Sequence, residues 1–338
     1  MNIILSGVGG VGKNVTKLLS ARPNYNIVAA YTRNQDYEGL DLGKHAGVDS
    51  INVKITSDRK DALETSADLL LIATTSFLKD VEDDIRTGVK AGLNVLTTAE
   101  EAAYPWIIDT KLADDLHQLS IESQVSIIGL GLNPGFIYDA LLLTASAIAW
   151  DVKSIKIRRV VDISRFSRTI QRRLGIGFTD AEFQAGVKAE SITGHIGFPQ
   201  SFHLAAHSMG KKIDGIKKAF SPLIADHKYI NDYLEVPAGT TGGFIQHVTA
   251  LVNGKAWITA EFIAHVEPES VGYTPSDSIA IDGYNEMNLT IEPGCQPQLG
   301  TAGMIANAIP RVIQAKPGFI TVADLAIPHA RETHGGFD

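Results

Sequence analysis

The sequence predicts an α/β protein of two domains, a doubly wound parallel sheet followed by an α+β domain. Three observations lead to this prediction. Apolar strand-like segments alternate with helical patterns over roughly the first 130 residues. A glycine-rich turn joins the first of these strands to the first helix. The second half contains several strands, two of which read as a hairpin, which indicates a largely antiparallel sheet.

The glycine-rich turn is the strongest functional signal. The first strand, expected over Ile3–Leu5, runs directly into Gly7, Gly9 and Gly12, which have G-x-G-x-x-G spacing, and a helical pattern follows at once. In such turns the first glycine permits the bend, the second lets backbone approach a pyrophosphate, and the third lets the helix pack closely. The strand and helix on either side give the motif its specificity. We therefore predict a Rossmann-type site whose cofactor-binding residues include Gly7, Gly9, Gly10, Val11 and Gly12. A turn with no ligand is the alternative.

Composition excludes several classes of protein. The chain has 338 residues, 44% of them hydrophobic and 20% charged, which is ordinary for a globular protein with two domains. A net charge of -8 argues against nucleic acid and anionic membranes as partners. Cys295 is the only cysteine, so a disulfide within the chain and a cysteine-based metal cluster are excluded. With no signal-peptide pattern and no apolar run of about 20 residues, we expect a cytoplasmic protein.

The end of the second strand bears on the choice of cofactor. This strand, expected over Asn26–Tyr31, is followed by Thr32 and Arg33 rather than by Asp or Glu. An acidic residue here holds the ribose 2′-hydroxyl of NAD, whereas an arginine suits the 2′-phosphate of NADP. We therefore expect NADP(H) as the preferred cofactor and NAD as the alternative. Arg33 could instead be a solvated loop residue that stacks on adenine.

Later strand ends add polar side chains at the same edge of the sheet. Residues 35–52 read as loop and residues 58–65 as a short helix. A continuous apolar strand over Asp68–Ala73 follows, and it ends in Thr74, Thr75 and Ser76. Ligands of such sheets lie beyond the carboxyl ends of the strands. These hydroxyls are therefore expected near the nicotinamide ribose, although capping of the helix over residues 78–91 would explain them as well.

Two adjacent carboxylates follow the next strand. That strand is expected over Asn94–Thr97, with Thr98 as a further cofactor residue, and Glu100 and Glu101 come just after it. Both glutamates could instead cap the following helix, expected over residues 106–122, or face solvent. After a strand at residues 125–128, the loop at residues 129–136 contains Asn133, which could orient the nicotinamide carboxamide or a substrate.

This loop is also the expected crossing between domains. The nucleotide-binding domain is expected over residues 1–132, with residues 300–338 packing back on it. The substrate and dimerisation domain is expected over residues 133–299. In it we predict a helix over residues 137–149, a strand over 153–162, a hairpin at Asn253-Gly254 and strands over 278–282 and 286–291. A last helix over residues 301–315 carries Pro310, which is expected to kink it.

Two further clusters of side chains have ambiguous meanings. Arg165 begins a group of arginines that could hold a substrate carboxylate or cofactor phosphate, or could form a solvated face. His203 and His207 have the i, i+4 spacing of metal ligands, but no third ligand is evident, so we predict no metal site.

Together these segments resemble a known family. The first half is similar to dihydrodipicolinate-reductase-type domains, and the whole is more similar to 2,4-diaminopentanoate dehydrogenase and the related native amine dehydrogenases. The similar segments are NVLTTAEEAAYPW at residues 94–106, GLGLNPGFIY at 129–138, RRVVDISRFSRTIQRRLGIG at 158–177, GHIG at 194–197 and TAGMIANAIPRVIQAKPGF at 301–319.

The resemblance implies an NAD(P)-dependent oxidative deamination of an amine or diamino acid, reversible as reductive amination of a ketone with ammonia, in a homodimer. We interpret Glu101, or else Glu100, as the catalytic carboxylate. Tyr138, Arg165 and His195 are candidate walls of the substrate pocket. Leu299–Ala302 stands where a diaminopentanoate enzyme would carry an Asp-Thr-Ala-Thr-like segment, so the particular amine stays open.

Two other functions remain open. One is a reductase of the dihydrodipicolinate type, although the chain lacks that family's His-His pair with a following lysine and its Ser-Gly-Thr motif. The other is a non-catalytic NADP-binding sensor, which would not need the adjacent carboxylates.

Overall fold

The computed structural model describes residues 1–166, 168–230 and 234–333 of the chain. It divides into two compact units, and each is treated by itself below. The first consists of Met1–Leu141 together with the residues from Pro297 onward, and the second of Leu142–Gln296.

The first unit is built on a seven-stranded parallel sheet of order β15-β6-β5-β4-β1-β2-β3. Its strands are β1 (Asn2–Ser6), β2 (Asn26–Tyr31), β3 (Ile55–Thr56), β4 (Leu69–Ile72), β5 (Asn94–Thr97), β6 (Ser126–Gly129) and β15 (Gly318–Ile320). The predicted doubly wound sheet is thereby confirmed. All four residues of β4 are fully buried, which explains its continuous apolar sequence.

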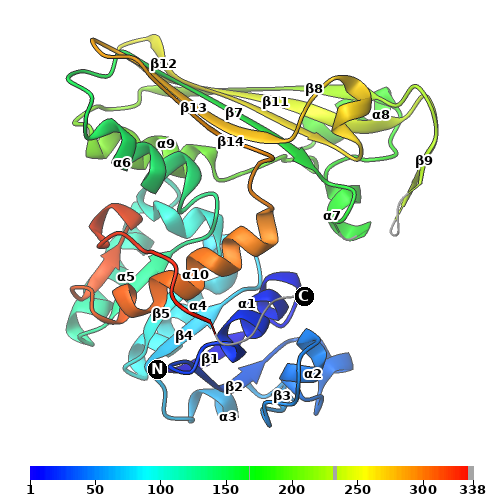
Figure 1. The fold of residues 1–338 in the computed structure, drawn as a ribbon. Coiled ribbons are helices and arrows are strands. Elements are labelled where there is room, and N and C mark those ends of the chain that lie inside the picture. Colours follow the sequence, from blue (N-terminus) through cyan, green and yellow to red (C-terminus); the bar gives the residue numbers. More distant parts are fainter. Residues whose placement is uncertain (167, 231–233, 334–338) are drawn as a thin grey trace. The chain divides into compact units, whose positions relative to one another are not determined.

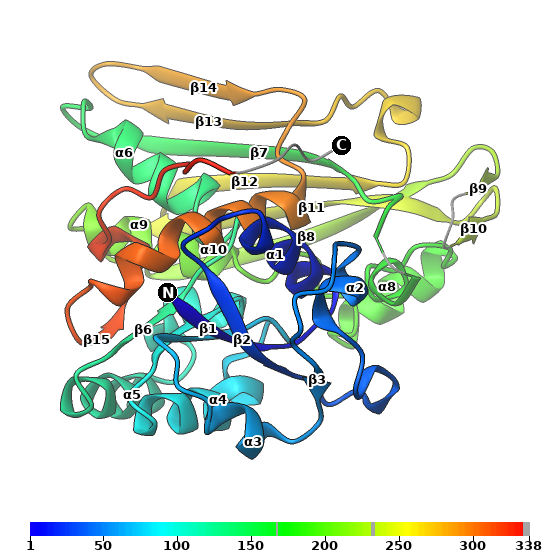
Figure 2. The same ribbon diagram turned by 60° about the horizontal axis from the view of Figure 1, so that its bottom comes forward.

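Helices cover both faces of this sheet (Figure 2). α1 (Gly10–Ser20) packs beside α10 (Pro297–Ile313) on one face, and α4 (Leu78–Lys90) beside α5 (Thr110–Glu122) on the other. The apolar stripe of α4, which includes Val81, Ile85 and Val89, packs into one core with Leu70 and Val95 of the sheet. That core fixes the first turn of α4 at the carboxyl edge of the sheet, where the candidate site lies.

Several boundaries differ from those that the sequence predicts. The loop expected over 35–52 contains η1 (Gln35–Tyr37) and α2 (Leu42–Ala46), so that expectation is wrong there. α2 was missed because it is short; Asp41 caps it and Gly47, with a φ of 80°, ends it. The helix expected over 137–149 is one π-helical turn, Ile137–Leu141, followed by α6 (Leu142–Ser146). The last helix starts at Pro297 and includes Pro310.

The second unit is a mixed six-stranded sheet of order β14-β13-β7-β12-β11-β8, antiparallel except between β7 and β12. The strands are β7 (Ser154–Asp162), β8 (Gly215–Ile224), β11 (Thr241–Val252), β12 (Lys255–His265), β13 (Ser276–Asp282) and β14 (Met287–Ile291), with a small pair β9 (Tyr229–Ile230) and β10 (Glu235–Val236). Asn253 and Gly254 both have positive φ, so the predicted type I′ hairpin is confirmed.

One face of this sheet is covered by helices (Figure 1). Phe183 of α8 (Asp180–Lys188) and Phe198 of α9 (Phe198–Ser208) pack against Phe244 and Phe262 of the sheet. The sequence pattern does not predict α8 or β8, and it indicates only a basic cluster where α7 (Arg168–Arg173) lies. β8 was missed because it is an edge strand whose lysines obscure the period-two pattern.

A buried ion pair anchors the segment around Cys295, which follows the last strand of this sheet. Arg159 of β7 and Asp277 of β13 approach to 2.9 Å, and each side chain is at most 5% exposed. The Cys295 carbonyl accepts a hydrogen bond from Arg159, and the Cys295 amide donates to Asp277 at 2.8 Å. Buried charges need such compensation, and here it fixes the chain just before α10.

The second unit is expected to lose stability as pH falls below about 6.5, the ordinary pKa of histidine. His265 is fully buried, and its Nδ1 accepts a hydrogen bond from the Glu267 amide at 3.0 Å. Burial therefore lowers the pKa of His265 in the folded state, despite the opposing charges of Glu267, Asp162 and Asp226. Because the folded pKa is lowered, the unfolded chain takes up the proton first as pH falls. The contribution of His265 to the free energy of unfolding is therefore fully present above about pH 6.5, and it is lost as pH falls through the folded pKa.

Chemical denaturation at pH 5 to 8 checks this expectation. Burial also lowers the pKa of His203. The free energy of unfolding is therefore expected to depend less on pH in His265→Gln, and less still in the double variant with His203→Gln. A slope in the double variant equal to that of the parent protein would contradict it.

The described residues contain no helix that is long and apolar enough to cross a membrane. Within the same residues, no group of three or more His, Cys, Asp or Glu side chains is arranged to hold a metal ion.

Candidate cofactor and active site

The carboxyl edge of the parallel sheet gathers the predicted site residues of the first unit. The strand order reverses between β1 and β4, which are direct neighbours, with β2 beyond β1 and β5 beyond β4. In open parallel sheets a crevice for ligands forms at this reversal. The loops after these four strands carry the glycine turn, Thr32 and Arg33, Thr74 to Ser76, and Glu100 with Glu101.

The three motif glycines have distinct surroundings. A Cβ on Gly7, whose φ is 91°, would lie 2.5 Å from the carbonyl oxygen of Ala73. A Cβ on Gly12 would lie 2.2 Å from the carbonyl oxygen of Gly7, whereas one on Gly9 would have nothing within 4 Å. The fold itself therefore requires glycine at positions 7 and 12. The open side of Gly9, next to the first amides of α1, is the place where a pyrophosphate can approach.

Distant side chains support the glycine turn. His45 of α2 contacts the Val8 carbonyl through Nε2 at 3.0 Å, and its ring packs against Tyr37. On the other side Asn14 donates to Gln298 at the start of α10. Sequence reasoning missed His45 and Gln298, because neither belongs to a motif and each reaches the turn from a remote segment.

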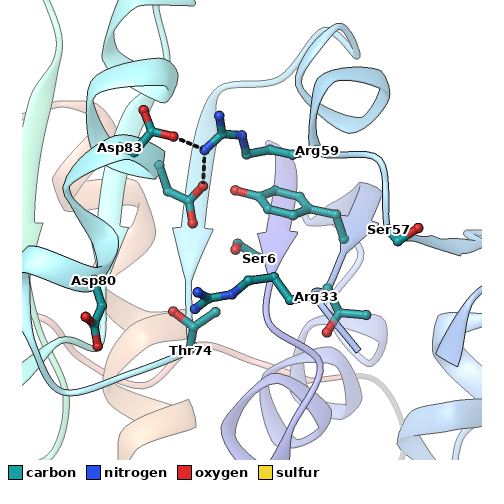
Figure 3. Close-up of a pocket in the computed structure, with 10 residues that line it drawn as sticks. Ser6, Arg33, Ser57, Arg59, Thr74, Asp80 and Asp83 are labelled. Carbon is teal, nitrogen blue, oxygen red and sulfur yellow. Dashed lines mark hydrogen bonds and ion pairs between the residues drawn. The ribbon is translucent and has the colours of Figure 1, made fainter. Parts of the chain in front are cut away.

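A pocket of about 380 Å³ lies beside the glycine turn (Figure 3). It combines the predicted residues Thr32, Arg33 and Thr74 with others that belong to no motif in the sequence. Those others are Ser6, Tyr31, Ser57, Arg59, Asp80, Asp83 and Asp84. The Gly7 amide donates to the carbonyl of Tyr31, which lines the pocket, at 2.9 Å, so the pocket adjoins the turn. Its position at the ends of β1 and β2 and its volume suit the adenosine part of a dinucleotide.

Charge is unevenly distributed around this pocket. Arg59 forms ion pairs with Asp83 and, at 3.0 Å, with Asp84, and these hydrogen bonds raise the pKa of its guanidinium above the usual value. Asp80 accepts a hydrogen bond from Thr75. Arg33, by contrast, is exposed and makes no ion pair with any residue in the described ranges. Burial raises the pKa of Tyr31, so its phenol stays neutral.

The two adjacent glutamates face the loop between β4 and α4. Glu100 Oε1 accepts a hydrogen bond from the Ser76 hydroxyl at 2.9 Å, and Glu101 Oε2 accepts one from the Leu78 amide at 2.8 Å. The Glu101 amide in turn donates to the Ser76 carbonyl. Both side chains are half-buried at the start of η2 (Glu100–Ala103). Glu101 thus caps α4, which precedes it in the chain, whereas the sequence suggested a cap for the helix that follows.

The loop after β6 is held tightly against the same edge. The Leu130 amide donates to the Thr97 carbonyl at 2.8 Å, and Leu132 donates to the hydroxyl of Thr301 in α10. Asn133 precedes Pro134 through a cis peptide bond and is half-buried. Tyr138, one turn later, is fully buried.

The remaining candidates belong to the second unit. Arg165 is exposed in the turn before α7. His195 is half-buried; its backbone exchanges two hydrogen bonds with the Gln246 side chain, and its ring lies edge-on to Phe198 at 4.8 Å. Within the first unit, then, the glycine turn, the pocket and the two glutamates share one edge of the sheet. Arg165 and His195 lie on separate segments of the other unit.

Comparisons with known proteins agree with this architecture. Residues 136–335 match the 2,4-diaminopentanoate dehydrogenase C-terminal domain, and residues 1–96 match the N-terminus of dihydrodipicolinate reductase. A 2,4-diaminopentanoate dehydrogenase from Acetoanaerobium sticklandii is 31% identical, over 98% of this chain and 94% of its own length.

Two amine dehydrogenases are also similar over nearly the whole length. The one from Streptomyces virginiae is 22% identical, over 97% of this chain and 96% of its own. The structure of the one from Mycobacterium smegmatis superposes with a TM-score of 0.86, over 98% of this chain and 97% of its own, at 23% identity.

Proposed function

The chain belongs to the 2,4-diaminopentanoate dehydrogenase family, and from this premise we propose how its residues catalyse oxidative deamination. It is an NAD(P)-dependent oxidoreductase that acts on CH–NH2 groups. The reaction converts an amine or a 2,4-diaminopentanoate-like diamino acid to the ketone and ammonia. In reverse it is a reductive amination.

The residues at the sheet edge fit a dinucleotide. Gly9 leaves open space in front of the first amides of α1, and the adjoining pocket carries Thr32 and Arg33 at the end of β2. Thr75, Ser76 and Thr98 would lie along the nicotinamide half, whereas Thr74 lines the pocket proposed for the adenosine part. A bound nicotinamide would supply the acceptance of hydride from the carbon that carries nitrogen, which is chemistry that no side chain can supply.

The chain's own contribution is proton transfer and charge stabilisation. The protonated amine must lose a proton to become neutral before its carbon can give up hydride, and the iminium that results must be attacked by water. We assign the proton transfers to Glu101, with Glu100 as the second candidate. The observation that carries this proposal is that both carboxylates are held, by Leu78 and Ser76, at the edge where the nicotinamide would lie. A correctly placed group of this kind contributes about 10²–10⁴-fold to the rate.

Other residues would shape the substrate pocket. Asn133 would orient the nicotinamide carboxamide or the substrate, and Tyr138, which is fully buried, would support the pocket wall from behind rather than form its surface. Arg165 and His195 would anchor polar groups of the substrate; an arginine suits the carboxylate of a diamino acid.

We propose NADP(H) as the preferred cofactor and NAD(H) as the alternative. Support comes from Arg33, an arginine with no ion-pair partner among the described residues, at the position where NAD-specific proteins carry a carboxylate.

Initial rates on a panel of diamino acids, amino acids and simple amines, each with NAD and NADP, test the function. We expect reduction of the cofactor with at least one amine and formation of the matching ketone. Tight NADPH binding without turnover of any amine would favour the sensor. Reduction of a cyclic C=N acid alone would favour a reductase of the dihydrodipicolinate type.

We also propose a homodimer formed through the second sheet. The face opposite α8 and α9 presents Lys156, Arg158, His247 and Glu261, all exposed or half-buried in central strands. A large sheet face of this kind suits association with a second copy. Sedimentation equilibrium is expected to give twice the 36.3 kDa of one chain. The mass of a single chain at micromolar concentration would contradict the dimer.

A further inference from the structure

The pocket beside the glycine turn holds two arginines in different states. Arg33 extends from the end of β2, and Arg59 from the first turn of α3 (Arg59–Leu63). Both line the same pocket of about 380 Å³ as Thr32, so both can reach a group bound there. Only Arg33 makes no ion pair with any residue of the described ranges.

Arg59 is already paired with two carboxylates of α4. Its Nη1 pairs with Asp83 and, at 3.0 Å, with Asp84, as Figure 3 shows for the labelled pair. The Asp84 side chain is 17% exposed and Asp83 is 79% exposed, so the inner carboxylate is the better shielded partner. A guanidinium whose charge is already matched offers little attraction to a second anion.

We propose that Asp83 and Asp84 set the discrimination between NADP(H) and NAD(H) by keeping Arg59 from the 2′-phosphate. Arg33 and Thr32 then hold that phosphate alone, against three carboxylates in the same pocket. The proposal rests on the proposed dinucleotide site and adds the residues that determine its preference. Removing the two carboxylates releases a second arginine and strengthens binding of the phosphorylated cofactor selectively.

Fluorescence titration of the full-length protein with NADPH and NADH measures the effect without requiring turnover. In Asp83→Asn/Asp84→Asn the ratio of NADPH to NADH affinity is expected to rise about tenfold, the size of one hydrogen bond to a charged group. Arg59→Met in the parent protein leaves Asp83 and Asp84 without their counter-charge, so a fall in the ratio is expected there from repulsion of the phosphate alone. In the double-Asn background the same substitution is expected to abolish the gain.

Glu82→Gln is the matched control. It removes one negative charge from the same helix, but Glu82 pairs with Lys79 and Arg86 and does not line the pocket. Its affinity ratio is expected to stay within about twofold of the parent. Asp83→Asn alone covers the case in which the double variant does not fold, because Asp83 is largely exposed; it is expected to raise the ratio in the same direction by a smaller factor.

Two results would overturn the proposal. One is an unchanged ratio in folded variants that lack Asp83 or both carboxylates. The other is a tenfold gain that persists when Arg59→Met is added to the double-Asn variant, because Arg59 would then not be the group that the carboxylates withhold. If the parent binds neither nucleotide, the proposed function itself fails, and that result is distinct from both.

Discussion

Replacing Glu101 by glutamine is expected to lower kcat for amine oxidation by about 10²–10⁴-fold, the usual contribution of a positioned acid–base group. The glutamine oxygen can still accept the hydrogen bond from the Leu78 amide that Glu101 Oε2 accepts at 2.8 Å. The cap of α4 therefore stays in place while the proton acceptor is lost. Initial rates at saturating amine and cofactor, together with thermal melting, measure the two effects separately.

Glu100→Gln is the companion variant. Its amide oxygen can still accept from the Ser76 hydroxyl, so the local hydrogen bond survives here as well. We expect the smaller loss of the two, because Glu101 is the first candidate for the base. Glu82→Gln provides the control for the loss of one negative charge and is expected to leave kcat unchanged. Near-normal turnover in both Glu101→Gln and Glu100→Gln would remove the general-base proposal.

Glu101→Ala separates structure from catalysis. Alanine abolishes the cap as well as the carboxylate, so this variant is expected to lose about 0.5–2 kcal/mol of stability that Glu101→Gln keeps. Equal activity losses in the two variants, with only alanine lowering the melting temperature, would assign the catalytic effect to the carboxylate.

Alanine at Gly9 and at Gly12 is expected to have opposite consequences. Gly12→Ala forces a Cβ to within 2.2 Å of the Gly7 carbonyl, so the glycine turn must shift, at a cost of about 1–3 kcal/mol. Gly9→Ala meets nothing within 4 Å and has an ordinary φ of -74°, so the fold is expected to be unaffected. Its methyl group instead occupies the side from which the pyrophosphate approaches, and NADPH affinity is expected to fall at least about tenfold, or ~1.4 kcal/mol.

Denaturant unfolding and NADPH titration on the same samples measure both effects. Gly303→Ala serves as the control, because a Cβ there also meets nothing within 4 Å and the residue lies inside α10. Gly303→Ala is expected to lower neither the free energy of unfolding nor the affinity for NADPH. Normal NADPH affinity in Gly9→Ala would contradict the assignment of the turn to the cofactor.

Much of the first unit was predictable because local patterns determine it. The short apolar run Leu69–Ile72 indicates a fully buried strand. The glycines at positions 7 and 12 belong to a spaced motif between a strand and a helix, and a Cβ at either position would meet backbone atoms. In the second unit the Asn253-Gly254 turn identified its hairpin for the same reason. Edge strand β8 and short helix α2 escaped prediction because their burial depends on neighbours distant in sequence.

The same distinction applies to the candidate site. The predicted strand ends identified Thr32, Arg33 and the two glutamates, because residue order alone places them at one edge of the sheet. The partners of these residues were not predictable. The pairing of Arg59 with Asp83 joins residues 24 positions apart, and His45 reaches Val8 across 37 positions. Nothing in the local sequence distinguishes those side chains from solvated ones.

Segments that lie far apart in the sequence complete the first unit. β15 pairs with β6, and α10 packs on α1, although about 150 residues of the second unit separate these partners in the sequence. During synthesis the ribosome therefore releases β1 to β6 long before the strand that closes their outer edge. Until Phe319 emerges, the β6 edge keeps unsatisfied peptide groups, and such edges recruit other chains. Proteins that end before α10 through nonsense mutation or proteolysis should accordingly enter inclusion bodies or be degraded, even though every residue of the glycine turn is present in them.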